Sequence, residues 1–217
     1  MAARFRTMLL LATGAAVVAF ALVLALDRPA GHSPAAHSSS SGAPAVGASD
    51  SGFDGAALPA GVPARGFTLT DQSGMPVTLQ SFRGQVVLLA FLDSTCGPSC
   101  ALIAQQIRGA LDELSRPVAA LIVSVDPSAD TQARVSRFLA QMSLSGRVHY
   151  LTGPLSELRP LWRAYRAPPA GAGTAVLDTS AVAVLIDARG FERVVFPLEQ
   201  LTPESLAHDI RGLQSES

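Results

Sequence analysis

Two uninterrupted apolar runs mark the middle of the chain. They cover residues 86–93 and 118–126, and runs of this kind are typical of strands buried on both faces of a sheet. Segments that alternate apolar and polar positions predict a hairpin at 67–79, a single strand at 148–153 and a second hairpin at 181–196. The pattern therefore predicts a sheet with a fully buried centre.

Apolar residues recur at helical spacing between and after these strands. The four segments with this spacing are 101–114, 131–142, 156–165 and 202–213. We expect Asp130 or Thr131 to cap the second helix, Pro160 to confine the third, and Thr202 to cap the last. The order of elements predicts an α/β fold with an N-terminal hairpin, a central sheet and flanking helices on both faces. A late hairpin followed by a helix is typical of a thioredoxin-like fold.

The N-terminus carries a different pattern. An uncharged run at 8–26 follows Arg4 and Arg6, and as a helix it would reach about 28 Å, close to the hydrocarbon thickness of a bilayer. It exceeds the usual apolar core of a cleaved signal peptide, although cleavage after Ala21 would be compatible with the small residues there. We expect a cytoplasmic segment at 1–7, a single-pass plasma-membrane anchor at 8–26, and a domain on the periplasmic or exterior side.

Composition separates a linker from the domain. Residues 27–64 are mainly Ala, Ser, Gly and Pro, which predicts a flexible tether because little apolar surface can be buried there. The expected domain covers residues 65–217. The chain has 217 residues, 48% of them hydrophobic, enough for one good-sized core. Its formal net charge of −1 gives no electrostatic basis for nucleic-acid binding.

The candidate chemistry lies in STCGPSCA at 94–101, which contains both cysteines of the chain, Cys96 and Cys100. Pro98 fits the first turn of a helix, so Cys96 should lie at or just before the helix N-terminus and Cys100 one turn inside. The helix dipole should lower the pKa of Cys96 and make it the more reactive thiolate. A Cα separation of about 6 Å would permit a disulfide.

Three readings of this pair follow from the residues alone. A static disulfide across so short a loop would add little stability. Redox exchange and binding of a soft metal both fit better, and the spacing does not distinguish between them.

Several stretches together resemble the SCO/SenC family, membrane-anchored thioredoxin-fold proteins associated with copper delivery to cytochrome c oxidase. The matching stretches are FTLTDQSG at 67–74, the strand around Phe91 followed by Cys96-x3-Cys100, SVDPSADT at 124–131, LTG at 151–153 and LIDARG at 185–190. The resemblance covers nearly all of residues 66–215. It implies a thioredoxin-like domain that binds copper through the two cysteines and one distal histidine.

Thr179 occupies the place where the resemblance would put that histidine, in the stretch Leu177–Ser180. Two thiolates suit Cu(I), whereas Cu(II) prefers imidazole ligands and a threonine hydroxyl suits neither. We therefore expect Cu(I) in preference to Cu(II), with the alternative that no copper is held. His149 and His208 do not align with the missing ligand, and Met142 is expected in a structural role.

Further departures from the family pattern lie around the cysteines. Ala101 stands where proline is common, and Asp93 stands at a site that is often aromatic. Asp126 and Asp130 follow a predicted strand and should form a turn and a helix cap, with a minor tuning role open to Asp126.

Three functions follow. The first is a tethered copper protein that uses Cys96 and Cys100 in assembly of the oxidase copper site, with an oxidase subunit or another copper protein as partner. The second is a thiol–disulfide oxidoreductase, in which Cys96 attacks a partner thiol protein and Cys100 resolves the mixed disulfide. The third is a non-catalytic sensor or interaction domain, which the cysteine pair disfavours. Whether the chain is an enzyme depends on the choice between them.

Overall fold

The computed structural model describes residues 51–168, 170–171 and 180–216. The expected cytoplasmic segment 1–7, the anchor 8–26, most of the tether and Thr179 lie outside these residues. Within the part that is described, no helix is both long enough and apolar enough to cross a bilayer.

A six-stranded sheet with the order β1-β8-β7-β4-β5-β6 forms the centre of the domain, and β2 and β3 make a separate hairpin. The strands are β1 (Ala56–Ala57), β2 (Thr68–Thr70), β3 (Pro76–Thr78), β4 (Val87–Leu92), β5 (Ala119–Ser124), β6 (His149–Leu151), β7 (Ala183–Ile186) and β8 (Glu192–Phe196). The helices are α2 (Pro98–Glu113), α3 (Gln132–Gln141), α4 (Leu155–Ala164) and α6 (Pro203–Ser215), with short 3₁₀ turns η1 (Leu79–Phe82) and η2 (Leu198–Gln200).

The two apolar runs become the central strands, as predicted. β4 pairs in parallel with β5 and antiparallel with β7, and every residue of β4 and β5 is buried. Side chains alternate between the two faces: Leu88 and Ala90 pack in one apolar cluster, Leu89 and Phe91 in the other. The expected α/β fold with a covered central sheet is confirmed.

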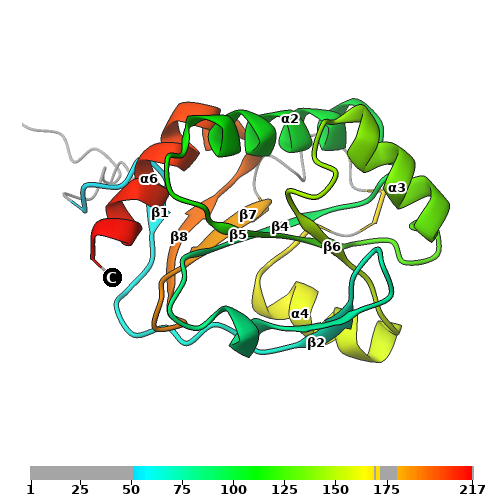
Figure 1. The fold of residues 1–217 in the computed structure, drawn as a ribbon. Helices are drawn as coiled ribbons and strands as arrows, with labels where there is room; N and C mark the ends of the chain where they lie inside the picture. Colours follow the sequence, from blue (N-terminus) through cyan, green and yellow to red (C-terminus); the bar gives the residue numbers. More distant parts are fainter. Residues whose placement is uncertain (1–50, 169, 172–179, 217) are drawn as a thin grey trace, which may run out of the picture. The chain divides into compact units, whose positions relative to one another are not determined.

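Helices cover the two faces unequally. Figure 1 shows α2, α3 and α6 over one face and α4 with the β2–β3 hairpin on the other. The last helix has the predicted Thr202 cap, strengthened by a reciprocal hydrogen bond from Ser205, and Pro203 in its first turn.

Pro160 does not confine its helix as the sequence suggested. α4 begins at Leu155 and continues four residues past Pro160, to Ala164. The proline forgoes one backbone hydrogen bond, but the helix buries Leu158 and Leu161 against the sheet. Burial of this apolar face holds the helix together across the proline.

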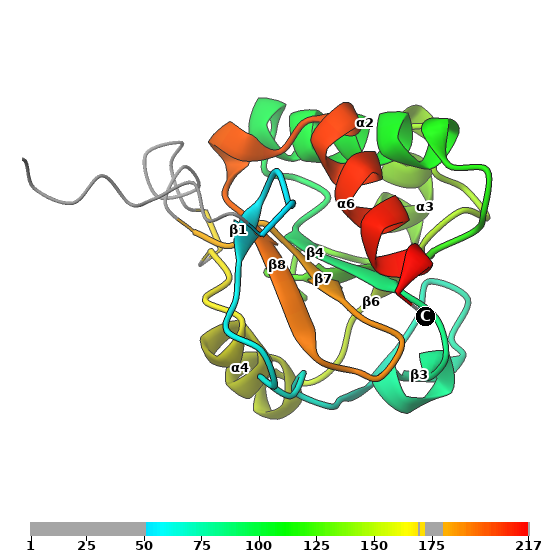
Figure 2. The same cartoon turned by 90° about the vertical axis from the view of Figure 1, so that its left-hand side faces the viewer.

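The domain begins before residue 65. Residues 51–64, which the sequence assigned to the tether, lie against the body of the domain, where β1 pairs with β8 and forms the edge of the sheet (Figure 2). The fully buried carboxylate of Asp209 in α6 accepts hydrogen bonds from the N–H groups of Asp54 and Gly55 at 2.8 and 2.9 Å. Gly55 is required at this point, because an added Cβ would lie 2.5 Å from a methyl carbon of Val194.

The β2–β3 hairpin is closed by a buried aspartate. Asp71 Oδ1 accepts hydrogen bonds from the backbone and side chain of Ser73 and from the N–H of Met75, and Oδ2 lies 3.2 Å from His149 Nδ1. Burial alone would raise the pKa of Asp71, but these hydrogen bonds outweigh it and lower the pKa from 3.8 to about 2.

Asp71→Asn should therefore change the acid dependence of stability. A lowered pKa contributes stability above the unfolded value, and this contribution is lost as the pH falls from about 4 towards 2. We expect the variant to be less stable than the wild type at pH 7 and to lose less stability across that interval. Urea unfolding at both ends of the interval measures the difference, and parallel losses in the two proteins would contradict the assignment.

Candidate functional site

The two cysteines lie where β4 passes into α2. β4 ends at Leu92 and α2 begins at Pro98, with Gly97 as its N-cap residue. Cys96 therefore just precedes the helix and Cys100 lies in its first turn, as the sequence predicted. The first N–H groups of a helix have no intrahelical partner and favour negative charge nearby, so this position suits thiolates.

Gly97 makes the turn into the helix. Its φ is 75° and its ψ is −140°, a conformation that residues with a Cβ rarely adopt. The following Pro98 needs no hydrogen-bond acceptor for its nitrogen at the first helical position. Gly-Pro between the cysteines thus fixes the angle at which the helix leaves the site.

Cys96 and Cys100 form a disulfide, with their Cα atoms 5.7 Å apart. Cys100 is 2% exposed and belongs to the apolar cluster under α2, whereas Cys96 is only partly buried. The geometry agrees with the predicted convergence of the two sulfurs. It also makes Cys96 the sulfur that a partner would reach first.

Asp93 adds a carboxylate to this pair. It follows β4 directly and is 3% exposed, and one of its oxygens lies within 4.8 Å of both sulfur atoms. Its Oδ1 accepts hydrogen bonds from the N–H and the hydroxyl of Thr95, both at 2.8 Å. The sequence marked Asp93 only as a departure from an aromatic family position. An acidic residue directly after a buried strand and just before a cysteine pair was the signal available.

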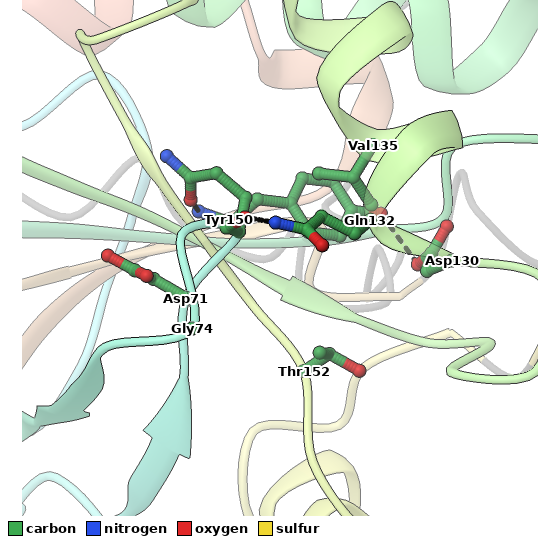
Figure 3. Close-up of a pocket in the computed structure, with 8 residues that line it drawn as sticks. Asp71, Gly74, Asp130, Gln132, Val135, Tyr150 and Thr152 are labelled. Atoms are coloured by element: carbon green, nitrogen blue, oxygen red, sulfur yellow. Dashed lines mark hydrogen bonds between the residues drawn. The ribbon is translucent and has the colours of Figure 1, made fainter.

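Asp130 anchors the loop that carries the cysteines. Its Oδ1 accepts the N–H of Ser94 at 2.7 Å, and its Oδ2 accepts the hydroxyls of Ser124 and Tyr150 at 2.5 and 2.7 Å. The carboxylate, only 4% exposed, thereby joins the loop after β4 to the ends of β5 and β6. Figure 3 shows the hydrogen bond between Tyr150 and Asp130.

The buried position of Tyr150 next to Asp130 changes the pKa of the Tyr150 hydroxyl. Burial raises the pKa of Tyr150 far above its usual value, and the negative charge of Asp130 raises it further. The hydroxyl is therefore a permanent donor to Asp130. Sequence reasoning assigned Asp130 to a turn or cap, but the cap of α3 is Thr131, whose side chain accepts the N–H of Arg134.

Asp126 closes the turn predicted for it. Its Oδ1 accepts hydrogen bonds from the side chain and backbone of Ser128, and the Ser128 hydroxyl is the main cause of its lowered pKa. It does not belong to the group of donors around the cysteines.

A separate pocket of about 200 Å³ has Asp130 in its wall. It is lined by Asp71, Gln72, Gly74, Asp130, Gln132, Val135, Tyr150 and Thr152 (Figure 3). The side-chain amide of Gln72 donates to the carbonyl of Val148 and accepts the N–H of Tyr150. The side-chain amide of Gln132 donates to the backbone carbonyl of Gln72. Neither cysteine lines the pocket, so its contact with the site passes through Asp130.

The alternative ligands lie elsewhere. His149 pairs with Asp71. His208, which lies on α6, contacts its neighbour Asp209 and also Asp54. Met142 is the C-cap residue of α3. Among the described residues, Asp93 is the one carboxylate or imidazole group that joins the two sulfurs within 4.8 Å.

The chemistry open to the site follows from its oxidation state. The disulfide offers no thiolate, so metal binding requires two-electron reduction to the dithiol. The reduced pair offers two neighbouring soft ligands, one partly exposed and one buried. The same pair, with one accessible and one buried sulfur, is also suited to thiol–disulfide exchange.

Proteins with Sco names resemble this chain in sequence and in fold. The SCO2 homologue of Bos taurus mitochondria is 31% identical over 113 residues, which span 42% of this chain and 42% of the bovine protein. ScoI of Bradyrhizobium japonicum, solved with copper bound, is 26% identical with a TM-score of 0.51 and covers 70% of this chain and 99% of its own.

BsSco, a Sco-family cytochrome c oxidase assembly protein with a disulfide switch, has the same fold at 23% identity. Its TM-score is 0.60, with 73% of this chain and 97% of BsSco covered. These structures confirm the thioredoxin-like arrangement. The SCO1/SenC family profile matches residues 59–215, which include both cysteines, Asp93 and Asp130. The chain belongs to the SCO1/SenC family.

Proposed function

We propose that this protein carries copper as Cu(I) between the reduced thiols of Cys96 and Cys100, for assembly of a copper site in cytochrome c oxidase. The observation that carries the proposal is the position of both sulfurs at the start of α2, joined in one bond and with Cys96 open to a partner. Family membership supports the cargo, since a relative has been solved with copper bound.

Cu(I) fits these donors better than Cu(II). Thiolates are soft ligands, and no imidazole of the described residues joins them. Thr179, which the family resemblance would put at the histidine position, lies outside the described residues. A Thr179→His variant should gain Cu(II) affinity if that alignment is right.

The remaining parts of the proposal concern place and partner. Residues 8–26 would hold the domain at the outer face of the plasma membrane. The partner would be an oxidase subunit or another copper protein that accepts Cu(I) through ligands of its own. The outer side of the plasma membrane is an oxidising environment, which is also compatible with the disulfide between Cys96 and Cys100.

The direct test is a Cu(I) titration of the fully reduced chain under anaerobic conditions, by competition with a chromogenic chelator. We expect one Cu(I) per chain in the wild type, weaker retention of Cu(II), and no stoichiometric binding by the Cys96→Ser, Cys100→Ser double variant. Tight Cu(II) binding in the wild type, or Cu(I) binding unaffected by the double substitution, would overturn the proposal.

A second function is favoured by the unequal exposure of the sulfurs. Cys96 thiolate would attack a partner disulfide and release one partner thiolate, and Cys100 thiolate would then displace the other partner sulfur. The products are the Cys96–Cys100 disulfide and a partner reduced by two electrons. A dithiol potential below about −300 mV would indicate a structural disulfide and count against exchange.

A further inference from the structure

We propose that Asp93 is a third metal ligand, which together with Cys96 and Cys100 allows the reduced site to hold a divalent ion that does not oxidise thiols, such as Zn(II), as well as Cu(I). The inference rests on the proposed function in one respect: it requires the two cysteines to act as a metal-binding pair. It concerns a residue that departs from the aromatic family position.

The donors are already close enough to share one ion. Each pair of ligand atoms among Asp93, Cys96 and Cys100 lies within 4.8 Å. Ligand distances of about 2.3 Å for sulfur and about 2.1 Å for oxygen place two donors of a zinc ion no more than about 4.6 Å apart. Reduction separates the sulfurs from bonding distance, while the carboxylate beside them needs only a small adjustment.

One oxygen of Asp93 is left for this role. Oδ1 is occupied by the N–H and hydroxyl of Thr95. No hydrogen bond from any described residue reaches Oδ2, and the residue is 3% exposed. A cation between Oδ2 and the two thiolates would use the oxygen that these hydrogen bonds leave open.

The charge of the reduced site also suits a divalent ion such as Zn(II). Two thiolates and one carboxylate carry three negative charges, and none of the ion pairs among the described residues involves Asp93. A divalent ion leaves a net charge of −1, whereas Cu(I) leaves −2. Uncompensated charge in a largely buried position is expensive. Two sulfurs and one oxygen also match the mixed donor sets that zinc and similar ions accept.

Asp93 also closes a turn with Thr95, and this structural role must be separated from ligation. Asp93→Asn does so, because the amide oxygen can accept the same two hydrogen bonds while the negative charge and most of the ligand strength are lost. Asp126→Asn is a matched control. Asp126 closes a turn with Ser128 through the same kind of bonds, at the end of the neighbouring strand, and lies outside the donor group.

The experiment titrates the reduced full chain with Zn(II), with Co(II) as a spectroscopic probe, and with Cu(I). Both divalent probes are used because neither oxidises the thiols. We expect Asp93→Asn to weaken Zn(II) binding about 10- to 100-fold and to alter the Co(II) absorption spectrum, while Cu(I) affinity changes less than about threefold. Asp126→Asn should match the wild type with all three ions.

A readout on the wild-type chain does not depend on the variant folding correctly. Binding of Zn(II) should shift the infrared carboxylate stretch of the reduced protein. Equal Zn(II) affinity in wild type and Asp93→Asn, or no carboxylate shift with Zn(II) bound, would overturn the role of Asp93 and leave Cu(I) transport standing. Failure of the reduced wild type to bind Cu(I) would instead overturn the proposed function.

Discussion

Cys96 in a Cys100→Ser chain is expected to react with a thiol-alkylating reagent about a hundredfold faster than Cys100 in a Cys96→Ser chain. Cys96 lies outside the helix and is partly exposed, whereas Cys100 is 2% exposed and packs under α2. Reaction at Cys100 requires opening of the first helical turn, and a local opening costing on the order of 3 kcal/mol lowers the rate about a hundredfold. Mass spectrometry of timed samples measures both rates.

The two variants serve as controls for each other, since each retains one thiol and neither can form the disulfide. Alkylation of both in the presence of denaturant should proceed at similar rates, which removes any difference due to the reagent. Equal rates in the native proteins would show that the sulfurs are equally accessible. Exchange that begins at Cys96 would then lose its structural basis.

Asp130→Ala is expected to lower the free energy of unfolding by about 3 kcal/mol or more. The substitution leaves the N–H of Ser94 and the hydroxyl of Ser124 without their acceptor, and it leaves the hydroxyl of Tyr150 only its longer bond to the Leu92 carbonyl at 3.2 Å. Each buried donor left unpaired costs about 1–3 kcal/mol, and water entering the gap recovers part of the sum. Urea unfolding monitored by circular dichroism measures the loss.

Asp126→Ala provides the comparison for this prediction, because it removes an aspartate that closes an exposed turn in the same loop. We expect it to cost about 1 kcal/mol or less. Asp130→Ala should in addition weaken Cu(I) binding, since Ser94 is no longer tied to β5 and β6 and the cysteine loop gains freedom. A loss of stability no larger than that of Asp126→Ala would mean that Asp130 does not anchor the loop.

Local pattern was sufficient for most of the architecture. The apolar runs at 86–93 and 118–126 could be buried only as central strands, and the structure places β4 and β5 there. Pro98 predicted the start of α2, and with it the different environments of Cys96 and Cys100. These features depend on residues a few positions apart, whose geometry the backbone fixes.

Features that depend on distant residues escaped the sequence. Residues 51–64 are held against the domain because the N–H groups of Asp54 and Gly55 donate hydrogen bonds to Asp209, about 155 positions away. Asp130 anchors the cysteine loop by accepting the N–H of Ser94, which is 36 positions away. α4 passes Pro160 because its apolar face is buried against the sheet.

The sequence by itself determined the central strands, the helices, the family resemblance and the position of the dithiol at a helix start. Only the tertiary structure decided that Asp93 lies beside both sulfurs and that Asp130 holds their loop. A carboxylate after a strand looks the same in sequence whether it closes a turn, anchors a loop or faces a metal site. Its role is set by the groups that folding brings to its two oxygens, and these come from other strands and loops.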